Sequence, residues 1–585
     1  MTIYKAPHEE QFFILEHLLG LDHFKSMPRY ADLSDDLIES VLTETAKLFE
    51  NIWHPLNQKA DMSGGCKLTA DGVKVPEDFH AAHKAYVDGG WIALAMDPAY
   101  GGQGLPETLA FSMLEQAVSA NTSLCGFYGC KSAATTILTH GNAEQKATYV
   151  ENLATGQWGG TMCLTEPHCG SDLGLLRTRA EPQGNGTYKI TGQKIFITGG
   201  DHDLTDNIIH LVLARLPDAP PGVKGISLFI VPKIMADGSR NSLSCTAVEK
   251  KMGLTASATC AMEFEAAIGF LLGAEHRGLN AMFTMINESR LSVSMQAYAL
   301  AEIATQNAVA YAHDRLQGRY IGGARDEGAV ADPIIVHPDV QRLLILNRAY
   351  IEAARAAIYW SVMQMDISRH HPDDETRRAA EDILSFMTPV LKGYLTEEGF
   401  EATSRALQCF GGHGYIRDTG VEQFLRDTRI TMIYEGTTGI QALDLLGRKM
   451  KFYPAFLKYL KDFTDGSDFP DDLRAYRDAL KSAIEVMEQA RAIVMALASD
   501  NPHAYAGVSV YFLRIVALLT MGYFWGLMVQ AAMQSKDSRF GEDFRARKKL
   551  TADAYFALVM PEIHALHHKI KAGANSFPDL RSVFA

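Results

Sequence analysis

The stretch Met162-Cys163-Leu164-Thr165-Glu166-Pro167-His168-Cys169-Gly170-Ser171-Asp172 stands where the periodicity of the chain changes. Before it, over residues 38–158, apolar residues recur three and four positions apart, which indicates amphipathic helices. After it, as far as residue 274, the period becomes two, and β-rich runs follow at 187–191, 194–198, 208–214 and 226–231. The stretch is therefore predicted to open a β domain inserted between helical segments, with a hairpin turn at Asn185-Gly186.

Helical periodicity returns after the β domain and continues towards the end of the chain. Residues 279–450 are predicted to form antiparallel helices of a bundle, broken by a Gly- and Asp-rich loop at 318–333 and a charged turn at 369–375. The predicted fold class is mainly α with an inserted β domain. Its expected parts are an N-terminal extension (1–37), an N-terminal helical domain (38–160), a middle β domain (161–275), a helical bundle (276–450) and a C-terminal helical domain (451–585).

The composition is typical of a multi-domain enzyme. The 585 residues are 47% hydrophobic and 21% charged, with a formal charge of −14, an acidic balance that argues against nucleic acid or an anionic membrane as the main partner. The eight cysteines form no CxxC pair, and the N-terminus lacks the apolar core of a signal peptide, so reduced thiols and a cytoplasmic location are expected. The uncharged segment 515–535 is long enough to span a membrane, but its polar residues favour a helix buried in the C-terminal domain.

Two of the chemically informative stretches belong to the predicted β domain. Around Pro167 and Gly170 the backbone must be irregular, so that its N–H groups can point at a ligand, and Thr165 and Ser171 add hydroxyls. The strand 194–198 ends in two glycines, where a planar ring could lie against the backbone. Taken singly, an ordinary polar loop and a strand leading into a turn explain these residues as well.

Two further stretches lie in the predicted bundle. The glycines of 408–415 follow a helix, which excludes a Rossmann loop and leaves either a pyrophosphate site or a plain helix C-cap. Glu435 stands between apolar Ile433-Tyr434 and Gly436, so partial desolvation should raise its pKa and suit it to act as a base. A solvated glutamate at a helix N-terminus is the alternative.

In combination and in this order, the four stretches resemble the acyl-CoA dehydrogenase family over residues 38–450. The loop 163–172 matches the family's first signature except at Cys169, where a smaller residue is usual; 408–415 matches the second, and Tyr434-Glu435-Gly436-Thr437 the catalytic turn. The resemblance implies a helical domain, a β-barrel-like domain and a four-helix bundle, with FAD at a subunit interface of a homodimer or homotetramer.

Carried over residue by residue, the resemblance implies FAD contacts in both halves of the protein. Arg315 resembles an arginine that reaches the FAD pyrophosphate in the adjoining subunit, although Gly318-Arg319 and a longer loop replace the usual Phe-Gly pair after it. The implied FAD-binding residues are Met162, Leu164, Thr165, Gly170, Ser171, Phe196, Ile197, Thr198, Arg315, Gln408, Gly411, Gly412 and Thr437.

The resemblance also implies the reaction. Glu435 is expected to take the α-proton of an acyl-CoA thioester while the β-hydrogen leaves as hydride to flavin N5, which gives a trans-2-enoyl-CoA. An electron-transferring flavoprotein is the expected acceptor of the electrons from the reduced flavin. Some family members carry the base before an arginine of an earlier helix; here Ser289 precedes Arg290, and Glu288 is a poor substitute. Ser171, Arg290 and Gly436 are the expected substrate-binding residues, with Arg290 holding the CoA portion.

The two ends of the chain narrow the resemblance to larger bacterial members that include 3-methylmercaptopropionyl-CoA dehydrogenase, which implies that substrate or another short-chain acyl-CoA. An acyl-CoA oxidase using oxygen is one alternative. A flavin-containing, DNA-associated protein is another, prompted by the basic run 545–549. Glu562 and the histidines at 564, 567 and 568 have metal-like spacing, but nothing nearby completes a shell and no metal is expected.

Overall fold

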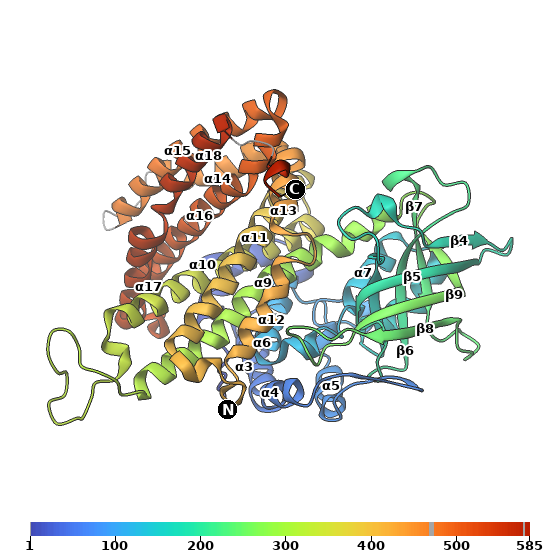
Figure 1. The fold of residues 1–585 in the computed structure, drawn as a ribbon, viewed down its shortest axis with the longest axis horizontal. Helices are drawn as coiled ribbons and strands as arrows, with labels where there is room; N and C mark the ends of the chain where they lie inside the picture. Colours follow the sequence, from blue (N-terminus) through green and yellow to red (C-terminus); the bar gives the residue numbers. More distant parts are fainter. Residues whose placement is uncertain (1, 467–472, 577–579, 585) are drawn as a thin grey trace. The chain divides into compact units, whose positions relative to one another are not determined.

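The structure is a computed structural model that describes residues 2–466, 473–576 and 580–584. It is mainly helical with an inserted β domain, which confirms the predicted fold class (Figure 1). The strands are β1 (Lys67–Thr69), β2 (Gly72–Lys74), β3 (Trp158–Cys163), β4 (Arg179–Pro182), β5 (Tyr188–Thr198), β6 (Asn207–Arg215), β7 (Ile226–Pro232), β8 (Leu243–Val248) and β9 (Thr259–Leu272).

The α-helices lie before and after the β domain, and the longest of them, α9, α10, α11 and α16, follow it. Those before it are α1 (His8–Phe13), α2 (Leu21–Lys25), α3 (Asp35–Leu48), α4 (His54–Met62), α5 (Asp78–Asp88), α6 (Glu107–Cys125), α7 (Cys130–His140) and α8 (Ala143–Ala154). Those after it are α9 (Gly278–Asp314), α10 (Pro338–His370), α11 (Asp374–Cys409), α12 (Glu422–Thr428), α13 (Thr438–Asp444), α14 (Tyr453–Asp465), α15 (Arg474–Asp500), α16 (Pro502–Gln534), α17 (Glu542–Ala554) and α18 (Glu562–Ser576).

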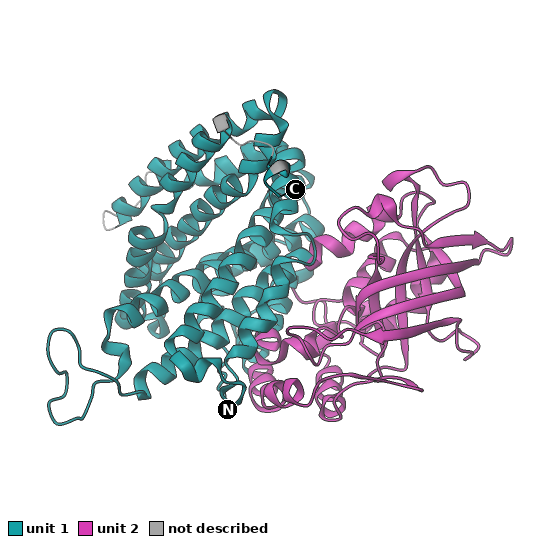
Figure 2. Cartoon of the chain, viewed as in Figure 1, with its two compact units in different colours: residues 1–43, 107–115, 290–585 teal, residues 44–106, 116–289 magenta. Residues whose placement is uncertain are grey.

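The chain forms two compact units, coloured separately in Figure 2. Unit 1 comprises residues 1–43, 107–115 and 290–585, and unit 2 comprises residues 44–106 and 116–289. The β domain therefore belongs to unit 2, as does α9 up to Ser289, whereas the rest of the bundle and the C-terminal helices belong to unit 1.

In unit 2 the strands close into a barrel-like sheet. The pairing runs from β6 through β4, β5, β9 and β7 back to β6, with β3 parallel to β6 and β8 antiparallel to β9 at its margins. Strands β6 and β7 are buried almost throughout, as their continuous apolar sequences require. The turn at Asn185-Gly186 joins β4 to β5 antiparallel, as predicted. The pair β1 and β2 was not expected in a segment predicted to be helical, because strands of three residues are too short to show a period.

In unit 1 the C-terminal helices pack on the bundle around α16. The indole N–H of Trp525 in α16 donates to the Ala349 carbonyl of α10 at 3.0 Å, and the Tyr555 hydroxyl donates to the Leu518 carbonyl at 2.6 Å. Among the described residues α16 is the one helix long and apolar enough to cross a membrane, and 89% of its most apolar window is buried inside the protein. This burial agrees with the predicted core helix.

The basic run 545–549 is engaged within unit 1. Lys548 is 2% exposed and its ammonium binds the carboxylates of Glu352, at 2.7 Å, and Glu10. Lys549 pairs with Asp553 at 2.9 Å, and the Arg545 guanidinium donates to the Ser535 carbonyl. Of this run, Lys548 is thus bound inside the fold, whereas Arg547 and Lys549 remain at the surface.

Candidate active site

The predicted base lies in a turn with unusual backbone geometry. Glu435 follows the 3₁₀ segment η11 (Arg429–Met432) and precedes α13, whose N-cap is Thr437. The backbone φ is +58° at Glu435 and +93° at Gly436. Glycine adopts this left-handed conformation readily, so Gly436 is unstrained. A glutamate adopts it only when the surrounding structure holds it, as it must at Glu435.

Burial controls the charge state of Glu435. It raises the pKa of Glu435 to about 7, against the lowering effects of the cations Arg290 and Lys392. Arg290, in the part of α9 that belongs to unit 1, pairs with Asp444 of α13 at 3.1 Å. A carboxyl with a pKa near neutrality exists as both acid and base at physiological pH, which is the property that a general base needs.

Two residues that the sequence did not single out hold this turn. The Lys392 ammonium of α11 donates to the Gly436 carbonyl at 2.5 Å, and the Gln441 amide of α13 donates to the Glu435 carbonyl at 2.9 Å. The position of Lys392 inside a largely apolar stretch, Phe386-Met387-Thr388-Pro389-Val390-Leu391 to Tyr394-Leu395, is the one signal that could have drawn attention to it. Gln441 carries no comparable signal.

A second group of predicted residues lines one open pocket of unit 1, of about 570 Å³. Arg315 follows the last residue of α9, while Gln408, Gly411 and Gly412 lie at the end of α11. A Cβ on Gly411 or Gly412 would meet nothing within 4 Å, so the backbone faces open space. The pocket thus combines a guanidinium, an amide and bare backbone, a donor set that suits an anionic group. The other lining residues are Tyr311, Gln317, Ile334, Cys409, Phe410, His413 and Ile416.

The β-domain residues meet where β5 runs beside the loop after β3. The Ile195 N–H donates to the Thr165 carbonyl at 2.9 Å, and the buried Lys194 ammonium reaches the Leu164 carbonyl at 3.0 Å and Glu166 at 2.8 Å. Burial acts to raise the pKa of Glu166, but Lys194 and the Thr178 hydroxyl outweigh it and hold the pKa below its usual value. Lys194 therefore fixes the predicted loop to the predicted strand, a role that its place inside a strand did not reveal.

The side chains of this group differ in what they offer a ligand. Phe196 has a φ of +60° and is 59% exposed, and Thr198 is also exposed. Ile197 is 2% exposed, so its backbone alone is available. Gly170 and Ser171 are exposed in the loop, and Met162 is half-buried in β3.

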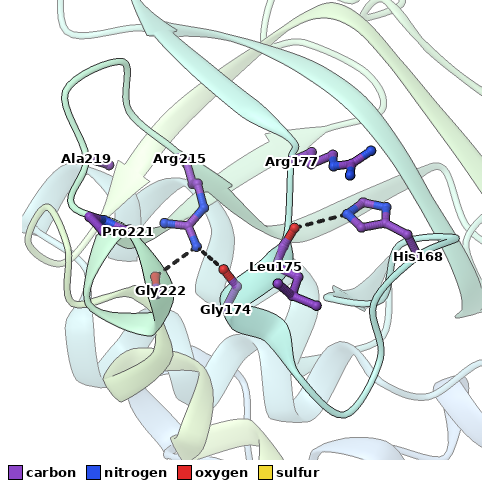
Figure 3. Close-up of a pocket in the computed structure, with 8 residues that line it drawn as sticks. All are labelled: His168, Gly174, Leu175, Arg177, Arg215, Ala219, Pro221 and Gly222. Atoms are coloured by element: carbon purple, nitrogen blue, oxygen red, sulfur yellow. Dashed lines mark hydrogen bonds between the residues drawn. The ribbon is translucent and has the colours of Figure 1, made fainter.

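The β domain contains a cavity of about 580 Å³, separate from the pocket of unit 1 (Figure 3). The Arg215 guanidinium donates to the carbonyls of Gly174 and Gly222, and His168 bonds the Leu175 carbonyl at 3.0 Å. These bonds use Arg215 and His168 to brace the loops around the cavity, and we assign it no ligand.

The competing features that the sequence raised have structural partners. Glu288 lies in the unit 2 part of α9, 4% exposed, with its carboxylate 4.0 Å from the Lys131 ammonium. Glu562 accepts from the Arg514 guanidinium at 2.7 and 3.0 Å. The loop 318–333 is organised by buried Asp332, whose carboxylate accepts from the N–H groups of Tyr320 and Arg325.

Family models match four parts of the chain. They are the N-terminal domain (65–157), the middle domain (161–267) and the C-terminal domain (276–450) of acyl-CoA dehydrogenases, and an acetyl-CoA dehydrogenase C-terminal-like domain (456–581). The chain belongs to the acyl-CoA dehydrogenase family. This enzyme family thus accounts for the β domain, the bundle and the appended helices alike.

Relatives of full length support the assignment. The acyl-CoA dehydrogenase described here is 39% identical to 3-methylmercaptopropionyl-CoA dehydrogenase of Ruegeria pomeroyi, over 97% of this chain and 98% of that protein. It is 34% identical to a broad-specificity linear acyl-CoA dehydrogenase of Mycobacterium tuberculosis, over 91% of each. Its fold is similar to that of an acyl-CoA dehydrogenase of Bacillus anthracis solved with FAD, with a TM-score of 0.75, 22% identity, and coverage of 94% of this chain and 90% of that one.

Proposed function

We propose that this enzyme binds FAD and oxidises a short-chain acyl-CoA thioester to the trans-2-enoyl-CoA, with Glu435 as the base. The observation that carries the proposal is the Glu435 carboxyl itself, which has a pKa of about 7 and lies in a turn held by Lys392 and Gln441. The α-proton of a thioester is weakly acidic, and a base of this strength can remove it only in a site that also stabilises the enolate.

The residues present fit FAD. Arg315, Gln408 and the open glycine backbone of the unit 1 pocket match the charge of a pyrophosphate. The exposed Phe196 and Thr198 offer a face and a hydroxyl for a flat ring, beside the loop hydroxyls of Thr165 and Ser171. When bound, FAD supplies an acceptor for the hydride that leaves the β-carbon.

The protein's own residues perform the other half of the oxidation. The ionised Glu435 carboxylate accepts the α-proton, so the C–H electron pair enters the Cα–Cβ double bond as the β-hydrogen departs. Among the described residues no protein acceptor takes the Glu435 backbone N–H, which is therefore available to the thioester oxygen. Ser171, Arg290 and Gly436 are the proposed substrate contacts, with Arg290 holding the CoA portion.

The proposed substrate is 3-methylmercaptopropionyl-CoA. Support comes from the relative of that name, which is 39% identical over nearly the whole of both chains. The relative at 34% identity is named for linear acyl-CoA substrates, so butyryl-CoA is the natural competitor. A much higher kcat/KM for butyryl-CoA or longer unbranched esters than for 3-methylmercaptopropionyl-CoA would move the assignment to ordinary fatty-acyl chains.

Anaerobic titration of the purified protein with acyl-CoA esters tests the core of the proposal, because bleaching of the flavin absorbance reports cofactor and substrate together. A colourless protein would refute FAD binding.

We propose an electron-transferring flavoprotein as acceptor and a homodimer or homotetramer as the assembly. Stoichiometric peroxide formed during fast aerobic turnover would favour an oxidase instead, and a flavin-loaded monomer at working concentration would contradict the assembly.

A further inference from the structure

The Glu435–Gly436 turn is held through its two carbonyl groups. The Gln441 amide donates to the Glu435 carbonyl at 2.9 Å and approaches the Gly436 carbonyl at 3.4 Å, while the Lys392 ammonium donates to the Gly436 carbonyl at 2.5 Å. A Cβ on Gly436 would stand 2.7 Å from the Gln441 amide nitrogen. Gly436 therefore leaves room for the Gln441 amide, and the left-handed backbone at Glu435 is fixed from outside the turn.

Lys392 is an unusual residue to use for this purpose. Its side chain is completely buried, and the hydrogen bond it makes is to a backbone carbonyl. A buried ammonium is costly unless an anion is near. Burial lowers the pKa of Lys392 to about 8, partly offset by the Glu435 carboxylate, whose effect exceeds that of the other anion, Glu397. The base and the lysine thus stabilise each other's charged forms.

We propose that Lys392 is a positioning residue for the base: with Gln441 it clamps the Glu435–Gly436 turn and, as a buried cation, favours the ionised carboxylate of Glu435. This inference rests on the proposed role of Glu435. It adds a residue that never touches the substrate, and it explains why a lysine lies within the apolar stretch of α11. The charged groups facing Glu435 are Arg290 from α9 and Lys392 from α11; Asp444 of α13 is paired with Arg290, and the Tyr434 hydroxyl donates to Gln296.

The sign of the electrostatic effect follows from these neighbours. Lys392 lowers the pKa of Glu435, so its removal leaves burial less opposed and raises that pKa further. In general, an opposite charge within about 4–6 Å of a carboxyl lowers its pKa by about 1–3 units. Because Glu435 must be ionised to accept a proton, Lys392→Met should move the rising limb of the pH–rate profile up by about one unit and slow flavin reduction at pH 7 about fivefold.

The experiment is stopped-flow flavin reduction of the FAD-loaded enzyme across pH for wild type, Lys392→Met, Glu435→Gln and the double variant. If Lys392 acts through the base, Lys392→Met should change the rate of the Glu435→Gln enzyme by less than about twofold. Lys548→Met, which removes another buried lysine of unit 1, is the matched control and should leave the rising limb in place. An unshifted limb in Lys392→Met, or an equal loss in both backgrounds, would overturn the proposal.

A readout independent of activity comes from amide hydrogen exchange over residues 430–441, which should accelerate in Lys392→Met and in Gln441→Leu. If Lys392→Met fails to fold, Gln441→Leu decides for the clamp: unchanged exchange and an unchanged reduction rate would overturn it. Failure of the proposed function itself would be seen in the Glu435→Gln variant. Wild-type reduction by Glu435→Gln would mean that Glu435 is not the base, whatever Lys392 does.

Discussion

The pH dependence of catalysis provides a stringent test of the base, because the pKa of Glu435 is displaced so far from the ordinary value. With a pKa of about 7, the ionised fraction of Glu435 is about 0.01 at pH 5 and about 0.5 at pH 7, so kcat/KM should rise about fifty-fold over this range. A carboxyl with its usual value of 4.5 would already be mostly ionised at pH 5 and would give only a small rise.

The assay is anaerobic stopped-flow reduction of the bound flavin at subsaturating and saturating substrate. The subsaturating rates report ionisations of the free enzyme and substrate, while the saturating rates report the complex. CoA phosphates also titrate in this range, so the affinity of a non-reacting CoA ester measured across the same pH values separates binding from proton removal.

Two variants sharpen the result. Glu435→Gln should retain the fold and the flavin, lose a factor of about 10²–10⁴ in flavin reduction and lose the rising limb. Glu288→Gln is the matched control on the competing glutamate, which lies near Lys131, and it should keep the wild-type limb. A flat profile for the wild type between pH 5 and 7, or a limb that survives Glu435→Gln, would refute the reasoning.

The remaining predictions concern cofactor retention and stability. Lys194→Met should lower the free energy of unfolding by about 3–5 kcal/mol, because Glu166 is left buried without its cation. It should also lower the ratio of FAD absorbance to protein absorbance. An unchanged melting temperature and an unchanged ratio would contradict the dependence of the loop on Lys194. Arg315→Leu should weaken FAD binding about ten- to hundred-fold, as expected for loss of a charge-assisted hydrogen bond, measured by rebinding FAD to the deflavinated protein; unchanged affinity would exclude the pocket as a pyrophosphate site. Lys548→Met should destabilise by about 3–5 kcal/mol and the exposed control Lys549→Met by at most about 1 kcal/mol in denaturant unfolding; equal effects would show that burial of the pair does not matter.

The order of helices and strands could be predicted because long elements carry their period in the sequence. The strands β5, β6 and β7 and the helices α10 and α11 fall where alternation and helical spacing place them. The closure of the sheet could not be predicted in this way, since the parallel contact of β4 with β6 rests on a single residue pair, Arg179 with Arg215. Pairing between distant strands depends on tertiary packing that a local pattern does not contain.

The candidate site shows the same division between local and tertiary information. Glu435 could be identified from the sequence, because a carboxylate between apolar residues and glycine is expected to be partly desolvated. In the structure, burial does raise its pKa. Lys392 acts across 44 residues of sequence on a backbone carbonyl, a group that every residue carries and that no sequence pattern marks. The local sequence can therefore indicate which side chain reacts. The cation that positions this carboxyl and favours its ionised form becomes evident only when α11 and the turn are seen together.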